Sequence, residues 1–269
     1  FIKNNIELLM VKCLQEQISN LDIPISVIPY GICRKTFNTI NKMDARKRLE
    51  TYKLNLGNSF VIFNGSKNCG KSRYDITIRA FANFISKNKD EDILLLLNCE
   101  NDNNIGYTLD NILDYEFSKI SIPNYKKYIR ILKLGNNLPD FILNLVYNAC
   151  DIGINTSDGE EYGLVNIEQG SVGIPQIVGN YYGFKENFNK DISFLLDPHD
   201  EYIYPLKRNG YIGGEAYILS HKDVSAKIEK YYKNRDLLDK QGIKLIEHFK
   251  DDKYNWNKIS KNFYNTIFS

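Results

Sequence analysis

Short apolar segments alternate with helical segments from residue 58 onward, and this alternation constrains the fold more than any other feature of the chain. The pattern predicts strands at 59–64, 92–98, 128–133, 151–155, 175–178 and 192–196, with helices at 75–86, 108–117, 137–149 and 163–172 between them. Strands alternating with helices are typical of βαβ units, and nearly continuous apolar strands indicate a sheet covered on both faces. We therefore predict an α/β fold, a Rossmann-like open parallel sheet with helices on both faces.

The segments on either side of this pattern are less regular. Apolar residues at helical spacing predict a helix over 6–18, a short strand is expected at 23–31, and a further helix at 44–52. The tail from 221 to 268 is predicted to be entirely helical.

Charge and cysteine usage exclude several classes of protein. The 269 residues hold 35 basic and 33 acidic side chains without a run of like charge, which argues against a dedicated nucleic-acid binder or a polybasic membrane anchor. The longest apolar run, Ile93 to Leu97, is far shorter than the roughly 20 residues of a membrane-spanning helix. The five scattered cysteines form no CxxC pair and have no histidine nearby. We therefore expect reduced thiols, a cytoplasmic location and no metal site.

A loop rich in glycine and lysine follows the first strand of the pattern. Residues 65–72 match the phosphate-binding pattern G-x-x-x-x-G-K-[ST] between a predicted strand and a predicted helix. Its backbone amides can approach phosphate oxygens, and Lys71 supplies positive charge. The next strand ends in Asn98 and Cys99, where a nucleotide hydrolase would need a magnesium-binding Asp. The loop predicts phosphate binding; a P-loop nucleotide hydrolase and a plain surface loop stay open as alternatives.

Two glutamates flank the start of the helix that follows the fourth strand. Glu160 lies in the loop, and Glu168 lies about one and a half turns into the helix, whose side chains lean back toward its start. The helix start leaves free amides at Gly163, Leu164 and Val165. Carboxylates accept hydrogen bonds from sugar and ribose hydroxyls, so this arrangement suits a nucleotide sugar. Capping of the helix by Asp158 and Glu161 explains the same acidic residues equally well.

Taken together, these motifs resemble glycosyltransferase family 4, retaining enzymes of the GT-B fold. The resemblance rests on Glu160 and Glu168 with Tyr162 to Leu164 between them, on Gly173 to Pro175, on Gly183 to Glu186, and on the loop and helix at 64–81. It covers roughly residues 58 to 200. It implies that the chain is the C-terminal, donor-binding half of such an enzyme.

The resemblance also implies roles for individual residues. Glu168 would bind the ribose, and Glu160 would contact the donor sugar. Lys67 stands where the family has an Arg, and Ser72 stands where it has a Lys, between Lys71 and Arg73. Glu161 and Tyr182 stand where the family has glycines. The implied catalytic residues are Lys67, Lys71 and Glu160, and the implied substrate-binding residues are Gly65, Arg73, Gly163, Leu164, Val165 and Glu168. No metal and no cofactor are implied besides the nucleoside diphosphate sugar that acts as donor.

A GT-B enzyme has two Rossmann-like domains, and about 57 residues precede the second one here. We expect residues 1–57 to be a remnant of the N-terminal domain with the linker, 58–220 the nucleotide-sugar-binding domain, and 221–269 the C-terminal helices. The chain begins with Phe, so we expect a fragment or a processed form whose partner is the missing N-terminal domain.

The expected activity is retaining transfer of a sugar from a nucleoside diphosphate sugar to an acceptor that is a glycan, a lipid or a protein. Contacts to the base are expected near Lys133 to Gly135. A non-catalytic GT-B-like binding module and a nucleotide-sugar epimerase are the further alternatives.

Overall fold

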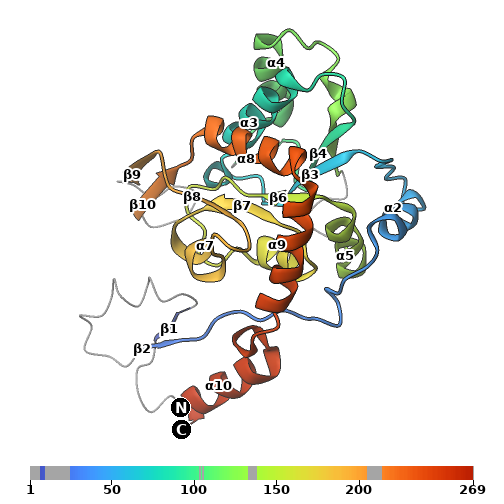
Figure 1. Cartoon of the computed structure of the whole chain (residues 1–269). Helices are drawn as coiled ribbons and strands as arrows, with labels where there is room; N and C mark the ends of the chain where they lie inside the picture. Colours follow the sequence, from blue (N-terminus) through green and yellow to red (C-terminus); the bar gives the residue numbers. More distant parts are fainter. Residues whose placement is uncertain are drawn as a thin grey trace.

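A six-stranded parallel sheet forms the centre of the molecule. The computed structural model describes residues 7–9, 25–102, 104, 106–132, 138–204 and 214–268. The sheet consists of β3 (Phe60–Asn64), β4 (Ile93–Leu97), β5 (Ile129–Ile131), β6 (Ile152–Ile154), β7 (Gln176–Gly179) and β8 (Phe194–Leu196). Their spatial order is β5-β4-β3-β6-β7-β8, and every pair of neighbours is parallel (Figure 1). This is the strand order of a dinucleotide-binding Rossmann sheet.

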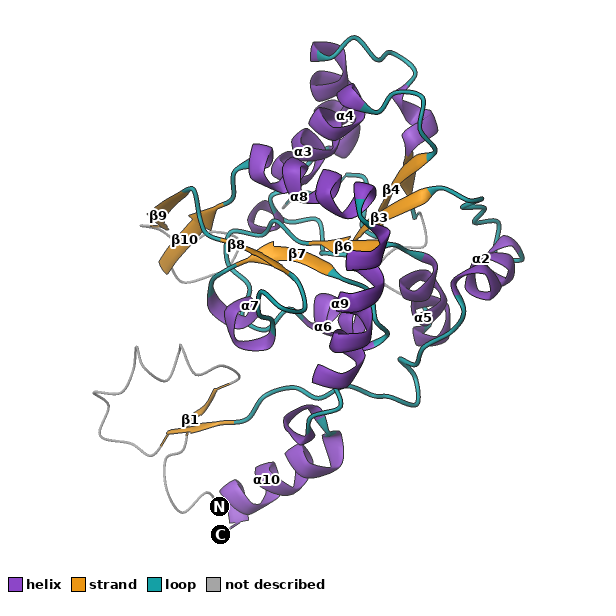
Figure 2. Ribbon diagram, viewed as in Figure 1, coloured by secondary structure: helices purple, strands orange, loops and turns teal. Residues whose placement is uncertain are grey.

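Helices cover both faces of the sheet, as Figure 2 shows. On one face lie α3 (Tyr74–Lys87), α4 (Leu109–Lys119) and α8 (His221–Lys233). On the other lie α2 (Lys42–Glu50), α5 (Asp140–Ala149), α6 (Leu164–Ser171) and α9 (Arg235–His248). Every residue of β3 and β4 is buried between these layers, which is why both strands are apolar almost throughout. The predicted fold class and the predicted order of strands and helices are confirmed.

The structure differs from the predictions in three places, and the first of them lies before the sheet. Glu7–Leu9 forms strand β1 and pairs in parallel with β2 (Ile25–Val27), so the helix predicted over 6–18 is wrong at these residues. A short apolar run fits either state, and pairing with a distant strand decides between them. The remainder of that predicted helix lies outside the described residues.

Two elements were not predicted, the short helix α7 (Tyr182–Asn187) and the antiparallel hairpin of β9 (Asp200–Tyr204) and β10 (Gly214–Ile218). The predicted helical tail is confirmed by α8, α9, the short turn η4 (Asp252–Tyr254) and α10 (Trp256–Phe268). The proposed division at residues 57 and 220 stays a prediction.

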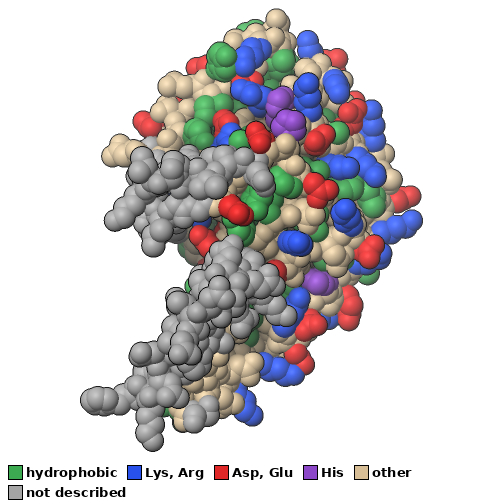
Figure 3. Space-filling model, turned by 90° about the vertical axis from the view of Figure 1, so that its left-hand side faces the viewer, with side chains coloured by type: hydrophobic (Ala, Val, Ile, Leu, Met, Phe, Trp, Pro, Cys, Tyr) green, Lys and Arg blue, Asp and Glu red, His purple; other side chains and the backbone are tan. Residues whose placement is uncertain are grey.

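The surface agrees with the charge pattern of the sequence. On the described part of the face shown in Figure 3, Lys and Arg side chains are mixed with Asp and Glu side chains, without one continuous basic patch. None of the helices among the described residues is long and apolar enough to cross a membrane. The four cysteines in the described part of the chain, Cys33, Cys69, Cys99 and Cys150, are free thiols.

Candidate functional site

The two predicted motifs meet where the order of the strands reverses. β3 and β6 are neighbours although the chain visits β4 and β5 between them. The loops that leave the carboxyl ends of these two strands carry the phosphate-binding pattern and Glu160, respectively. In open α/β sheets, ligands bind in the crevice at this switch point.

The glycine-rich loop after β3 is held in shape by its own hydrogen bonds. Residues Gly70–Ser72 form a 3-10 turn, η1, and the Ser72 hydroxyl donates to the Lys67 carbonyl at 2.5 Å. The Asn68 amide donates to the carbonyls of Glu100 and Tyr107 at 2.9 and 2.7 Å. Because Ser72 is buried and bonded within the loop, its hydroxyl does not face a ligand site as a magnesium-binding P-loop serine does.

The helix after this loop also begins differently from a P-loop helix. α3 starts at Tyr74, after Arg73 adopts a left-handed conformation with φ of 47°. A left-handed backbone conformation costs conformational energy in a residue other than glycine, and such residues are frequent at functional sites. The buried Ser72 hydroxyl and the left-handed Arg73 both differ from the features of a magnesium-binding P-loop, which argues against the nucleotide hydrolase.

The three predicted cations differ in their partners. Lys71 Nζ lies 3.2 Å from Glu161 Oε2. Arg73 binds Asp75 through two hydrogen bonds of 3.0 and 2.9 Å. Burial favours the neutral form of Asp75, but the hydrogen bonds and the charge of Arg73, together with hydrogen bonds from Tyr107 and the Ile76 amide, outweigh it and lower the pKa of Asp75. Lys67 is exposed and forms no ion pair within the described part of the chain.

Several hydrogen bonds join the two loops. The Asp158 amide donates to the Lys71 carbonyl, and the Thr156 hydroxyl donates to the Arg73 carbonyl, both at 2.9 Å. Thr156 also hydrogen-bonds Thr77 of α3 at 2.7 Å between their hydroxyl oxygens. The sequence gives no sign of these residues as joints, because their meeting depends on β3 and β6 being neighbours. The backbone positions of the phosphate loop and the Glu160 loop are therefore coupled.

Glu160 sits between the loop and the start of α6. Burial raises its pKa, the nearby charge of Lys71 lowers it, and Glu161 raises it again. The Glu160 carbonyl accepts a hydrogen bond from the Gly183 amide at 3.1 Å, which ties the loop to α7. Glu160 thus lies near enough to Lys71 to feel its charge, and its carboxyl group is harder to ionise than an exposed one.

Glycines permit the close packing at the start of α6. Gly163 precedes the helix with φ of 81°, and a Cβ there would lie 2.6 Å from Phe184 Cε1. A Cβ on Gly65 would lie 2.7 Å from the Phe63 ring and 3.1 Å from Val165 Cγ1. Gly65 therefore lets the phosphate loop lie against the first turn of α6, where Leu164 and Val165 have free amides.

Asp158 and Glu161 do not cap α6, so the capping alternative is wrong. The residue before α6 is Gly163, and it makes no capping hydrogen bond through a side chain. Asp158 is buried in the loop, and Glu161 pairs with Lys71. The Gly163 amide instead supports the Glu160 carboxylate and lowers its pKa.

Glu168 is partly buried and has a partner that the sequence did not indicate. The Tyr147 hydroxyl, from α5, donates to Glu168 Oε2 at 3.0 Å. Burial raises the pKa of Glu168 to about 7, although the Tyr147 hydrogen bond acts in the other direction. Tyr147 is fully buried against Phe37 and Phe63, with ring centroids 5.6 and 5.7 Å away. Nothing in the spacing of residues 147 and 168 predicts this contact, because it depends on α5 and α6 lying side by side.

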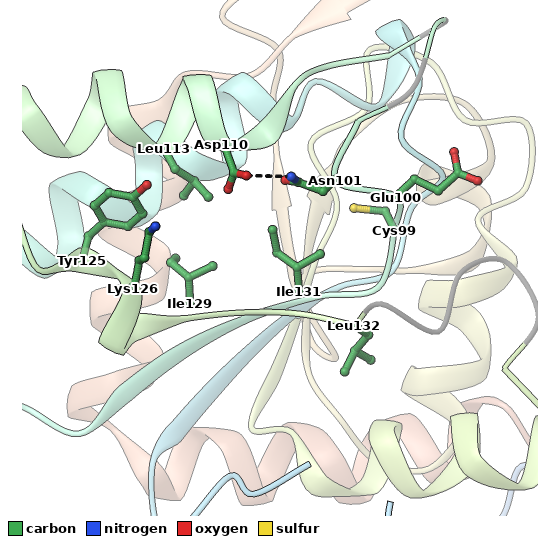
Figure 4. Close-up of a pocket in the computed structure, with 10 residues that line it drawn as sticks. All are labelled: Cys99, Glu100, Asn101, Asp110, Leu113, Tyr125, Lys126, Ile129, Ile131 and Leu132. Atoms are coloured by element: carbon green, nitrogen blue, oxygen red, sulfur yellow. Dashed lines mark hydrogen bonds between the residues drawn. The ribbon is translucent and has the colours of Figure 1, made fainter. Parts of the chain in front are cut away.

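A separate pocket of about 600 Å³ lies beside β4 and β5 (Figure 4). Asn101 donates to Asp110 at 2.7 Å on its wall, and burial raises the pKa of Cys99 to about 11, so that thiol stays protonated. None of the predicted site residues lines this pocket. Leu132, on its wall, directly precedes the predicted base-contact segment, which lies outside the described residues.

Comparison with models of known protein families gave no match, and no curated protein matches the sequence. Solved structures match instead. A glycosyltransferase from Rickettsia africae superposes with a TM-score of 0.74 and 17% identity over 99% of this chain and 63% of that one. Anabaena HepE, in complex with UDP and glucose, superposes with a TM-score of 0.71 and 15% identity over 97% of this chain and 62% of that one.

A third match shows which domain of such a protein this chain is similar to. The C-terminal domain of a group 1 glycosyl transferase from Francisella tularensis gives a TM-score of 0.58 and 15% identity over 81% of this chain and 96% of that domain. The chain thus spans less than two thirds of the length of the first two proteins. Together these likenesses show that the chain has the fold of the C-terminal, Rossmann-like domain of GT-B glycosyltransferases.

Proposed function

We propose that this chain is the donor-binding half of a retaining glycosyltransferase of family 4. The observation that carries the proposal is the convergence of two loops at the β3–β6 switch point. One brings Lys71 and Lys67, and the other brings Glu160 and leads to Glu168. The solved structure of Anabaena HepE holds UDP and glucose on a similar fold, which makes a UDP-sugar the first donor class to test.

In the proposed reaction, the bond between the sugar C1 and the diphosphate oxygen breaks. A bond from C1 to an acceptor oxygen forms on the same face, and the proton of the acceptor hydroxyl passes to the departing diphosphate oxygen. Negative charge grows on the leaving diphosphate, and Lys67 and Lys71 would stabilise it there without a metal ion. Arg73 is the weaker candidate for this role because two hydrogen bonds hold it on Asp75, whereas the partner of Lys71, Glu161, is about half exposed and can turn to water.

Glu160 and Glu168 have different proposed tasks. Glu168 would accept hydrogen bonds from the ribose hydroxyls, and Glu160, next to Lys71, would contact the donor sugar. Gly65 and Gly163 would allow the diphosphate to approach the start of α6, where the amides of Leu164 and Val165 would hold it; the Gly163 amide supports Glu160. The acceptor, the missing N-terminal domain and the cytoplasmic location remain predictions.

Calorimetric titration tests the proposal. UDP, GDP, their sugars and ATP are each titrated into the chain with and without magnesium. We expect a nucleoside diphosphate or its sugar to bind without magnesium, with at least tenfold loss in Glu168→Ala and in Lys71→Gln. Magnesium-dependent ATP or GTP binding that is lost in Lys71→Gln would establish the nucleotide hydrolase instead. No binding of any of these ligands would favour the non-catalytic module.

A further inference from the structure

A second cavity lies at the opposite end of the sheet, where the strands begin. It has a volume of about 700 Å³ and is lined by residues at the starts of β3, β6 and β7 and by α2 and α9. No residue of the candidate donor site lines it. Its size is in the range of small-molecule sites.

Positive charge gathers at one side of this cavity. Asp151 is buried, and three cations lie around its carboxylate: Lys42 at 2.7 Å, Arg46 at 3.1 Å and Arg235 at 3.8 Å. Lys42 and Arg235 approach the same oxygen, Oδ1, so their charged ends converge. Their side chains are 43% and 50% exposed, so both can also reach a ligand.

The other charges leave this cluster positive. Arg46 is committed to the protein, because it also donates to the carbonyls of Ala149 and Gly57 at 2.9 and 3.1 Å. Asp239 is the second carboxylate on the cavity wall. Three cations therefore face two carboxylates, and an anion placed between Lys42 and Arg235 would be attracted by both.

Arg235 is also held in place from a second side. Its guanidinium lies 4.3 Å from the centre of the Phe60 ring and 5.0 Å from that of Tyr232. Such stacking orients a guanidinium without using its N–H donors. The donors of Arg235 are therefore positioned beside the cavity at little further entropic cost.

Much of the remaining wall of the cavity is apolar, with the polar side chains of Thr39 and, near the start of β3, of Asn58 and Ser59. The apolar part includes Met43, Val172, Ile174, Leu238, Ile243 and Ile246. Ile243, on α9, is 71% exposed, so its side chain is accessible to the apolar part of a ligand. A ligand that matches both walls has an anionic end and an apolar body.

We propose that this cavity binds an amphiphilic anion. Its phosphate or carboxylate would sit between Lys42 and Arg235, and its apolar part would lie along α9 against Ile243 and Ile246. The proposal does not depend on glycosyl transfer, because the cavity and the donor site share no residue.

The test uses hexyl phosphate, inorganic phosphate and hexanol, each titrated calorimetrically into the whole chain. We expect hexyl phosphate to bind more tightly than the other two. Arg235→Gln and Lys42→Gln should each weaken it at least fivefold while the Arg46–Asp151 pair preserves the fold. Lys240→Gln, an exposed cation on the same helix, should change it less than twofold. Ile243→Asn should reduce the ratio between the affinity for hexyl phosphate and the affinity for inorganic phosphate.

Three results would overturn the proposal. The first is an absence of hexyl phosphate binding at millimolar concentration, and the second is an equal response of Arg235→Gln and Lys240→Gln. The third is a loss in Lys71→Gln but not in Arg235→Gln, which would place the phosphate in the donor site. Sedimentation with phosphatidic acid vesicles then shows whether the anion that this cavity binds belongs to a lipid or to a soluble ligand. Arg235-dependent vesicle binding points to a lipid, and hexyl phosphate binding without it points to a soluble ligand; both support the site.

Discussion

The burial of Glu168 makes its protonation, and with it the proposed binding of ribose, depend on pH near neutrality. Because its pKa is raised to about 7, nearly all of it is protonated at pH 5. In the proposed function, it is the ionised form that would accept hydrogen bonds from the ribose hydroxyls. We expect affinity for UDP to rise about tenfold from pH 6 to pH 8, following the ionised fraction of Glu168. Calorimetry across this range measures it, and Glu168→Gln, which cannot ionise, corrects for titration of the ligand. Parallel profiles in the two proteins would contradict the prediction.

The raised pKa of Glu168 also makes the free energy of unfolding depend on pH. The unfolded chain releases this proton near 4.5, and the folded chain keeps it until about 7. The raised pKa therefore contributes stability that is present below the unfolded value and is lost as the pH rises through about 7.

Tyr147 offers a sharper test at a single hydroxyl. Tyr147→Phe keeps the buried ring but removes the donor to Glu168. A hydrogen bond to a charged group contributes roughly 1.5–3 kcal/mol, so we expect UDP affinity to fall about tenfold or more. Binding of 2′-deoxy-UDP should change less, because it lacks one of the hydroxyls that Glu168 would bind. Tyr232→Phe is the matched control, since its hydroxyl donates to a Glu91 carboxylate oxygen at 2.6 Å near the start of β4, at the opposite end of the sheet. Equal losses for UDP and 2′-deoxy-UDP would reject this role.

At the scale of elements, the start of α6 depends on one glycine. Gly163→Ala puts a methyl group 2.6 Å from Phe184 and keeps a φ of 81° that Ala disfavours. We expect a loss of about 2–4 kcal/mol in the free energy of unfolding, measured with urea. Gly57→Ala has φ of 52° and no heavy atom within 4 Å of the new Cβ, so it should cost only about 1–2 kcal/mol. If both variants lose equal stability, contact with Phe184 is not what requires the glycine.

The elements that could be predicted are those whose pattern is local. β3, β4 and α3 have long, regular apolar patterns, and the structure has them within two residues of the predicted bounds. The strand at Glu7–Leu9 and the helix α7 depend on distant partners, and α7 begins at Tyr182 with a positive φ of 46° that no propensity suggests.

The candidate site shows the same limit. Its motifs could be recognised along the chain, whereas the Tyr147–Glu168 hydrogen bond and the Lys71–Glu161 pair join residues 21 and 90 positions apart. Such contacts follow from strand order and helix packing, which a single sequence fixes only weakly.

At the scale of the whole molecule, residues before the sheet and after it are packed together. The Ile32 amide donates to the Tyr254 carbonyl at 2.9 Å, and the Tyr162 hydroxyl donates to the Tyr30 carbonyl at 2.6 Å. Gly31 lies so close to the Trp256 ring that a Cβ would be 2.9 Å from it. The segment that enters the domain is thus held by the segment that leaves it, beside the loop of the candidate donor site.

Asp151 joins even more of the molecule, because its carboxylate binds α2, the start of β3 and α9 at once. Its Oδ2 accepts from the Val61 amide at 2.8 Å and from Arg46, whose side chain is 6% exposed. Asp151→Ala would leave a buried guanidinium without its counter-charge, so we expect a loss of about 3–5 kcal/mol in the free energy of unfolding. Hydrogen exchange should show the amides of α2 opening sooner.

Glu116→Ala is the matched control for this loss. Glu116 is as buried as Asp151, but its partners Arg79 and Lys119 are 41% and 43% exposed and can turn to water. Its removal should therefore cost about 1 kcal/mol. Urea unfolding of both variants decides the matter. Similar losses would mean that the charge left on Arg46 finds water after all, and that the cluster around Asp151 does not hold α2 and α9 to the sheet.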